Sequence, residues 1–176
     1  MKVTRYAASR ILRILEATAL GSLDDETLEA MILNFNAFRK VVEELESLKI
    51  ELSKRLYGEQ SKKSDEEKKR LSDFSELIRR IGKTDAEERI RLDALAKKEY
   101  PELYELHKKE RATIVSLLNK AVDVEVKKVD GDELVKCVLK GKKDVSVGEV
   151  YSILSPMFEA AERPEAAFSE IDELLK

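Results

Sequence analysis

One stretch of the sequence, residues 28–56, constrains the fold more than any other. Its apolar side chains recur at alternating intervals of four and three residues, with one interruption at Lys49, and they are Met31, Phe35, Phe38, Val42, Leu45, Leu52 and Leu56. This spacing averages about 3.5 residues, which places the side chains along one seam of a helix that packs lengthwise on another helix. Burying them contributes on the order of 10–20 kcal/mol, comparable to the net stability of a domain. The seam is therefore predicted to be structural and to need a covering helix.

The composition is typical of long, solvent-exposed helices. Charged residues make up 39% of the 176 residues and aromatic residues only 6%, and there are few glycines (6) and prolines (3). This mixture favours extended helices. Apolar residues still reach 43%, which separates the chain from disordered charged sequences. The sequence therefore predicts a folded, mainly helical protein.

Charge and cysteine usage exclude several classes of partner and location. The net charge of −3 creates no field that would concentrate a polyanion, so we expect no nucleic-acid binding. The single cysteine, Cys137, excludes an intramolecular disulfide and is consistent with a reducing compartment. No apolar run approaches the roughly 18 residues of a membrane span. Arg10 and Arg13 also interrupt the first apolar stretch, unlike in a secretory signal. We expect a cytoplasmic protein without a membrane partner.

Helix start and stop signals divide the sequence into three predicted regions. Residues 1–21 are an N-terminal arm and a first helix, and residues 22–121 are a helical hairpin with a charged tip near residues 59–70. Residues 122–176 are a head made of a strand, short helices and an acidic C-terminal helix. The predicted fold class is mainly α: a long antiparallel, coiled-coil-like helical hairpin with a small α+β head formed by the N-terminal arm and the C-terminal third.

Capping residues define the ends of the predicted helices. Thr4 and Ser22 precede the first helix and the long helix as N-caps. Gly58 ends the long helix. The tip at residues 59–70 carries charges of both signs with no aromatic residue among them, which favours a solvated turn over a nucleic-acid or regulatory patch. Three capping boxes open later helices: Ser64 with Glu67, Thr84 with Glu87, and Ser146 with Glu149.

The return path of the hairpin runs from residue 64 to residue 121 and is interrupted at Tyr100-Pro101. Proline disfavours helical geometry in the residue before it and lacks a backbone donor, so a break or kink is expected there. The path is long enough to pack antiparallel along residues 28–56. The seam is predicted to be covered in this way.

The hydrophobic period changes after the hairpin. Residues 122–129 alternate apolar and charged side chains, with the apolar ones at Val122, Val124 and Val126. This alternation is typical of a half-buried strand, and the turn signal Asp130-Gly131 follows it. One strand cannot satisfy its own backbone groups. Two partners remain open: residues 2–4 of the N-terminal arm, or residues 143–147.

The last part of the chain is predicted to form short helices over residues 132–139 and 147–154, with Ser155-Pro156 opening another. Residues 157–176 hold six acidic and two basic residues and have apolar side chains at helical spacing. Such an amphipathic helix needs a surface to lie on. The segment is therefore a possible partner surface, formed by Phe168, Ile171, Leu174 and Leu175.

Candidate catalytic and metal-binding residues are few. His107, the only histidine, forms an H-x-x-E pair with Glu110. A di-iron carboxylate bundle needs such a pair from each of two helices, and one histidine cannot supply it. Cys137 lies on a predicted amphipathic helix, where a packed side chain is the favoured interpretation over a nucleophile. Gly141 lacks the spacing of a phosphate-binding loop. The sequence predicts no catalytic residue, no metal ligand and no cofactor.

The order of features adds a resemblance. The chain opens with M-K-V-T, continues through a first helix to L-D-D-E-T at residues 23–27, and enters a long helix. After a charged middle come V-D-V-E-V-K-K-V, D-E-L-V-K-C-V-L and S-V-G-E-V. In this order the chain resembles a group of small, functionally uncharacterised proteins encoded by bacteriophages and prophages. The resemblance covers most of the chain and implies a morphogenesis or accessory factor rather than an enzyme. It assigns no functional residue.

Two function classes fit these observations. The first is a non-enzymatic protein–protein interaction protein, a phage-encoded assembly, scaffold or accessory factor. The second is an inhibitor or adaptor of a host enzyme, of the anti-defence type. Leu48 flanks the seam and Leu33 lies on a different side of the helix, so we expect one hairpin partner to leave apolar surface uncovered. Such surface usually becomes an interface. We therefore expect a protein partner or a homo-oligomer, in the cytoplasm of the host cell.

Overall fold

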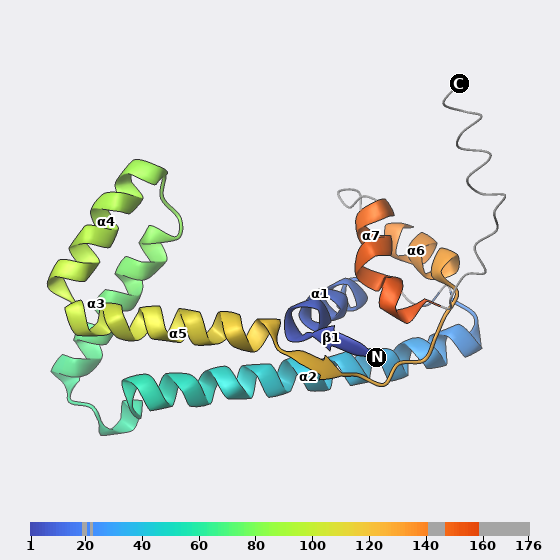
Figure 1. Ribbon diagram of the computed structural model, residues 1–176, viewed down its shortest axis with the longest axis horizontal. Helices are drawn as coiled ribbons and strands as arrows, with labels where there is room; N and C mark the ends of the chain where they lie inside the picture. The colour runs from blue at the N-terminus through green and yellow to red at the C-terminus, as the bar shows by residue number, and fades with distance from the viewer. Residues whose placement is uncertain (19–20, 22, 141–146, 159–176) are drawn as a thin grey trace. The chain divides into compact units, whose positions relative to one another are not determined.

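The computed structural model describes residues 1–18, 21, 23–140 and 147–158 and is mainly helical, which confirms the predicted fold class at this level (Figure 1). The strands form a two-stranded sheet. In chain order the elements are β1 (Lys2–Thr4), α1 (Arg5–Glu16), α2 (Asp25–Tyr57), the 3-10 helix η2 (Gln60–Lys62), α3 (Asp65–Ile81), α4 (Ala86–Glu99), α5 (Pro101–Asn119), β2 (Ala121–Asp123), α6 (Gly131–Lys140), α7 (Val147–Leu154) and the 3-10 helix η3 (Ser155–Met157).

Two compact units make up the chain. The first unit contains Met1–Glu43 and Lys120–Lys176, and the second unit contains Glu44–Asn119. The long helix α2 contributes its first part to the first unit and its last part to the second. Among the described residues, no helix has both the length and the apolar composition that crossing a lipid bilayer requires.

Helix α2 is defined by signals at both ends. Asp24 accepts a hydrogen bond from the backbone N–H of Thr27 at 2.9 Å, and two acidic residues in the first turn oppose the positive end of the helix dipole. Ser22, the predicted N-cap, lies outside the described residues, and Asp24 supplies the cap. Gly58 has a φ of 73°, a left-handed conformation that favours glycine directly after a helix. The predicted end of the helix at Gly58 is confirmed.

The two strands pair antiparallel in the first unit, with Lys2 opposite Asp123, Val3 opposite Val122, and Thr4 opposite Ala121. The N-terminal arm is therefore the strand partner, which confirms one of the two predicted alternatives. Most of the other alternative, residues 143–147, lies outside the described residues. Strand β2 is shorter than the predicted strand over residues 122–129. Thr4 also caps α1 as predicted, since its side chain accepts a hydrogen bond from Ala7 N at 3.1 Å.

Beyond β2, Val124 continues the register of the sheet by exchanging hydrogen bonds with Met1, whereas residues 125–129 are held by scattered hydrogen bonds. The backbone groups of residues 124–129 bond to three different parts of the first unit: Val124 N to Met1 O at 2.8 Å, the Lys127 backbone to the Asn34 side chain, and Val129 N to Met157 O at 3.0 Å. Val129 also forms an isolated bridge with Phe158. The prediction of a regular strand as far as residue 129 is therefore wrong, because each backbone partner comes from a different element.

The core of the first unit is formed by α1, the first part of α2, residues 124–129, α6 and α7. One face of α1 is buried at helical spacing, and α7 contacts both α1 and α6. Cys137 is 4% exposed and is a packed side chain of this core, as expected. The most deeply buried members of the core are Ala8, Ile11, Leu15, Met31, Phe38, Leu134, Val138, Val150, Leu154 and Met157.

The predicted seam of α2 is divided between the two units. Four of its residues lie in the core of the first unit or pack against it: Met31, Phe35, Phe38 and Val42. The other three lie in the second unit: Leu45, Leu52 and Leu56. The expectation that the return path covers the whole seam is therefore not met in its first half. There the apolar faces of α1, α6 and α7 lie in the same core as the seam residues, because these short amphipathic helices need to bury apolar surface as much as the seam does.

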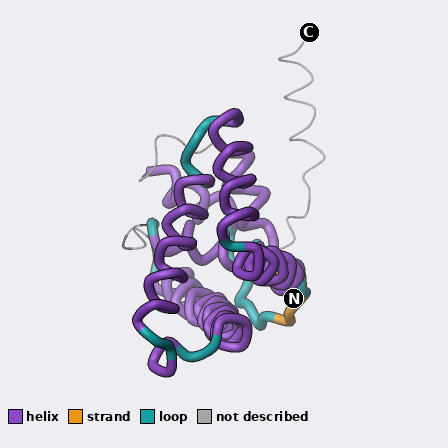
Figure 2. The backbone as a smooth tube through the Cα atoms, turned by 90° about the vertical axis from the view of Figure 1, so that its left-hand side faces the viewer, coloured by secondary structure: helices purple, strands orange, loops and turns teal. Residues whose placement is uncertain are grey.

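Helices α3 and α4 of the second unit lie side by side and are joined by a short loop (Figure 2). The predicted capping box at the start of α3 is confirmed: Glu67 N donates to Ser64 Oγ at 3.2 Å and Ser64 N donates to Glu67 Oε2 at 2.8 Å. The predicted box at Thr84 is wrong by one residue, because Asp85 is the N-cap of α4 and accepts from Glu88 N at 2.9 Å. A carboxylate is favoured at the positive end of a helix dipole. The Thr84 hydroxyl bonds to the Glu88 side chain instead.

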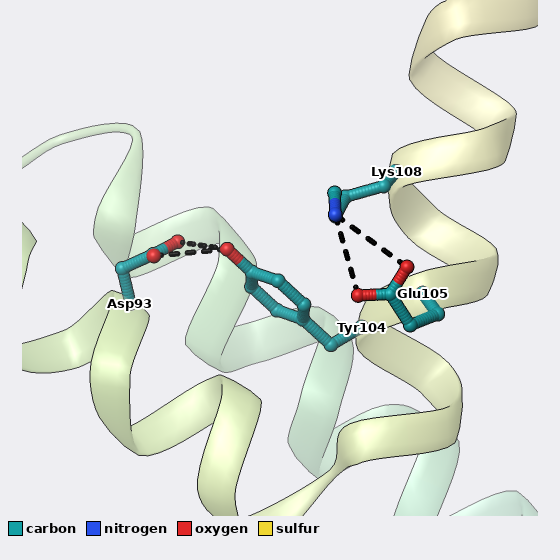
Figure 3. A network of polar contacts seen from close by, with 4 residues as sticks. All are labelled: Asp93, Tyr104, Glu105 and Lys108. Carbon is teal, nitrogen blue, oxygen red and sulfur yellow. Dashed lines mark hydrogen bonds and ion pairs between the residues drawn. The ribbon is translucent and has the colours of Figure 1, made fainter.

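The chain breaks at Tyr100-Pro101 as predicted, with α4 ending one residue before it and α5 beginning at the proline. Across this break, the Tyr104 hydroxyl donates to both carboxylate oxygens of Asp93 at 2.9 Å and ties α5 to α4 (Figure 3). Lys108 and Glu105 form an ion pair at 3.3 Å within α5. The buried residues of this second core are Phe74, Leu77, Leu92 and Ala96.

The helices after β2 correspond to the predicted ones, but some of them begin or end at other residues than predicted. Asp130 Oδ1 accepts from Asp132 N at 2.8 Å and caps α6, so the predicted turn at Asp130-Gly131 is the start of a helix. Helix α7 occupies the predicted range of residues 147–154. Ser155-Pro156 begins only the short 3-10 helix η3. Ser146 and residues 159–176 of the predicted acidic helix lie outside the described residues.

Candidate functional site

A groove of about 1090 Å³ opens in the second unit between the end of α2, the loop that follows it, α3 and α5. All of its lining residues belong to this unit. The lining combines apolar side chains, hydroxyl groups and two lysines. The residues that define its chemistry are Ile50, Tyr57, Phe74, Ile78, His107 and Glu110.

Three side chains form the polar part of the groove. Tyr57, the last residue of α2, donates its hydroxyl to Glu110 Oε2 of α5 at 3.0 Å. His107 lies one turn before Glu110, and its Nδ1 is 3.8 Å from the same oxygen, which is longer than a hydrogen bond. The spacing of three residues places His107 and Glu110 on one face of α5. Tyr57 completes the group from the facing helix.

Burial changes the proton affinity of two of these groups. Burial, together with the negative charge of Glu110, raises the pKa of Tyr57 far above its ordinary value of 10.0, so the phenol stays protonated and acts as a donor. Burial lowers the pKa of His107 below 6.5, while the carboxylate of Glu110 opposes this shift and the positive charge of Arg111 adds to it. The imidazole is therefore neutral at neutral pH.

The wall of the groove opposite α5 is apolar. Phe74 of α3 is 2% exposed and contacts His107 edge-on, with 6.0 Å between the ring centroids. Its ring also lies 5.7 Å from the ring of Tyr100. Such ring contacts hold the imidazole in one orientation. Ile50 of α2 lines the same groove and is 56% exposed, so it offers apolar surface at the edge of the groove.

A lysine closes the loop at the end of α2. Lys63 Nζ donates hydrogen bonds to the carbonyl oxygens of Tyr57 and Gly58, which satisfies carbonyl groups that a helix end leaves without partners. The charged tip predicted at residues 59–70 is exposed apart from half-buried Lys63. This agrees with a solvated turn and gives the groove a polar rim.

The groove contains potential metal ligands and hydroxyl groups. His107 and Glu110 are potential ligands, but within the described part of the chain no group of three or more His, Cys, Asp or Glu side chains is placed to hold a metal ion. Ser75 lines the groove and donates its hydroxyl to Leu71 O at 2.7 Å. It is therefore not paired with His107 as a nucleophile is paired with its base.

The apolar seam in the last part of α2 is only partly covered, and so are the apolar side chains of α5. Leu45 is 1% exposed, whereas Leu52 and Leu56 are half-buried. All residues of α5 are described, and none of them is fully buried. The apolar residues of α5 nevertheless recur at helical spacing, at Leu103, Leu106, Ile114 and Leu117. Helices that are covered on all sides bury such side chains completely. The second unit therefore retains apolar surface along this seam.

Sequence reasoning found some of these residues and missed others. It singled out His107 and Glu110 as a pair, and the seam residues Leu52 and Leu56 as structural. It missed Ile50, which lies off the seam, although an apolar residue between Lys49 and Glu51 on a charged helix face was a usable signal. The possible partner surface predicted in the C-terminal tail lies outside the described residues: Phe168, Ile171, Leu174 and Leu175.

Comparison with known proteins adds no relative to this description. The chain matches no protein family, no curated protein and no solved structure with which it was compared.

Proposed function

We propose that this chain is a non-enzymatic protein–protein interaction protein, an assembly, scaffold or accessory factor that binds another protein or itself. The observation that carries the proposal is the apolar surface of the second unit that is only partly covered. Leu52 and Leu56 of the α2 seam are half-buried, and Val115, on another side of α5 from Ile114, is 56% exposed. A fully buried side chain of this size contributes about 1.5–3 kcal/mol relative to an exposed one, so a chain that covers the seam gains binding energy.

The form of the seam is part of the same proposal. We propose that α5 packs antiparallel along the last part of α2 as a coiled-coil-like pair. The hydrogen bond between Tyr57 and Glu110 supports this pairing. A second cavity supports it too, because Leu56 of α2 and Leu103 and Leu106 of α5 line it together. The alternating spacing of the α2 seam is the pattern that such packing requires.

Binding rather than catalysis also agrees with the groove. Its single imidazole has the Tyr57–Glu110 pair and Phe74 as neighbours, and the lining hydroxyl of Ser75 is engaged with the backbone. The surface beside it is apolar at Ile50 and charged at its rim. Protein interfaces commonly combine an apolar centre with a polar rim.

Affinity purification of the full chain from the organism that encodes it tests the proposal. A bound protein should be recovered with the native sequence and lost with Val115→Glu, which places a charge on the exposed apolar part of α5. The control Ser116→Glu adds the same charge to an exposed position on a different side of the same helix and should retain the partner. A virion component among the captured proteins supports the assembly role, and a host enzyme supports the inhibitor or adaptor role. Equal capture by both variants would place the binding surface elsewhere and contradict the proposal.

A further inference from the structure

The charges on one face of α2 change sign about Ile50. Residues three or four apart share a helix face, so Glu46, Ile50 and Lys54 lie on one stripe. Ile50 is 56% exposed, the side chain of Glu46 is 56% exposed, and Lys54 is exposed. The stripe is therefore acidic on one side of an exposed apolar residue and basic on the other, at equal distances along the chain.

The stripe borders the groove of the second unit. Ile50 and Lys54 line the groove together with the half-buried side chains of Leu71 and Ile78 of α3. Apolar surface therefore continues from Ile50 into the groove rather than ending at one side chain. This continuity gives the centre of the stripe more apolar area than an isolated surface isoleucine has.

We propose that this stripe is the interface of a homodimer, in which the α2 helices of two copies pack antiparallel about a two-fold axis at Ile50. The proposal goes beyond the proposed function, because it gives the chain a second copy of itself as a partner at a surface other than the one that contains Val115. The two Ile50 side chains meet at the axis. Each Glu46 lies opposite Lys54 of the second copy, so one interface contains the same ion pair twice.

The order of the charges selects a second copy as the occupant. Reversing the direction of a stripe that is acidic, apolar and basic gives one that is basic, apolar and acidic. Two copies are therefore complementary when antiparallel and repel each other when parallel, as a two-fold interface requires. A displacement by one helical turn places Ile50 against a charged side chain, which opposes the wrong register. An unrelated protein would need its own matching stripe.

The existing partner of Glu46 does not prevent this arrangement. Glu46 Oε1 accepts a hydrogen bond from Lys49 Nζ at 2.7 Å within the helix. Exposed pairs of this kind contribute little to stability. A carboxylate has two oxygens and accepts several hydrogen bonds. Glu46 can therefore bond to Lys49 of its own chain and to Lys54 of the second copy at the same time.

Charge exchange in the full chain tests the proposal, with light scattering after size exclusion as the measurement. The native chain should have the mass of two chains. Glu46→Lys and Lys54→Glu should each have the mass of one chain, because each variant places like charges opposite each other twice. An equimolar mixture of the two variants should again have the mass of two chains, because every pair is then opposite in charge. Ile50→Glu should lose the dimer as well.

A matched control is Arg55→Glu, which reverses an exposed charge one residue away, on a different side of the helix, and should keep the mass of two chains. A native chain with the mass of one chain at all concentrations overturns the dimer. So does a single variant that keeps the mass of two chains, or a mixture that stays at the mass of one. A chain that is monomeric but still captures a partner through Val115 overturns the dimer alone. A charge-dependent dimer whose capture of a partner is unaffected by Val115→Glu overturns the proposed binding surface alone.

Discussion

The side-chain amide of Asn34 forms two hydrogen bonds with the backbone of Lys127, with Nδ2 donating to the carbonyl oxygen at 2.8 Å and Oδ1 accepting from the N–H at 2.7 Å. Asn34 is fully buried in the first part of α2. An amide side chain presents a donor and an acceptor side by side, as a neighbouring strand does. Asn34 therefore takes the place of a strand partner and holds residues 124–129 against the long helix.

Replacing Asn34 by alanine should destabilise the first unit by about 1–3 kcal/mol, because it leaves two partly buried backbone groups of Lys127 without partners. Urea unfolding of the native chain and of the Asn34→Ala variant measures the difference in the free energy of unfolding. Asn36→Ala is the matched control, since Asn36 is an exposed asparagine two residues away on the same helix. Equal loss of stability in both variants would show that the cost comes from the change of residue type and not from the contact with Lys127.

Phe38 carries the largest fully buried side chain of the first core. Phe38→Ala should lower the free energy of unfolding by about 3–5 kcal/mol, because it removes the ring and leaves a cavity. Thermal melts should show the loss clearly, whereas Lys40→Ala, at an exposed position of the same helix, should change the melting temperature little. Similar melting temperatures for both variants would contradict the placement of the core along the α2 seam.

The parts of the fold that depend on local chemistry could be predicted from the sequence. Thr4 and Ser64 cap helices, Gly58 ends the long helix, and Pro101 separates two helices, because each of these residues acts on its own neighbours in the chain. The error at Thr84 is also local. Two adjacent residues could each cap α4, and the carboxylate of Asp85 was the stronger candidate.

The parts that depend on distant contacts could not be predicted. The alternating valines after residue 121 gave a strand pattern, but the backbone there bonds to a buried asparagine 93 residues away. The seam of α2 had a single period, yet its first half lies in the core of one unit and its second half belongs to the other unit, which periodicity cannot distinguish. The contact of Tyr57 with Glu110 has no sequence signal beyond the end of a helix. Only the tertiary arrangement brings these groups together.

Removing residues 1–4 should speed up amide exchange at Val124, because the N–H of Val124 donates to Met1 O and exchange requires this bond to be broken. The N–H of Val129 provides an internal control, since it donates to Met157 O and should keep its protection. Exchange measured by NMR on the two proteins gives both values from the same spectra. Unchanged exchange at Val124 would show that the N-terminal arm does not hold this segment in solution.

The imidazole of His107 should titrate below its ordinary pKa of 6.5, because burial disfavours its charged form more than the carboxylate of Glu110 favours it. Since the unfolded chain then binds this proton more readily than the folded one, the stability contributed by His107 is complete above about pH 6.5 and is lost as the pH falls towards the lower folded pKa. The protein has one histidine, so a single imidazole signal in an NMR titration reports the value directly. Glu110→Gln should lower the midpoint further by removing the opposing charge, and Arg111→Gln should raise it by removing a positive one.

In denaturation curves, His107→Gln should show a smaller loss of stability than the native chain between about pH 7 and pH 5. A native midpoint at or above 6.5 would mean that the imidazole faces water, and that the groove is more open in solution than the contacts with Phe74 and Glu110 require.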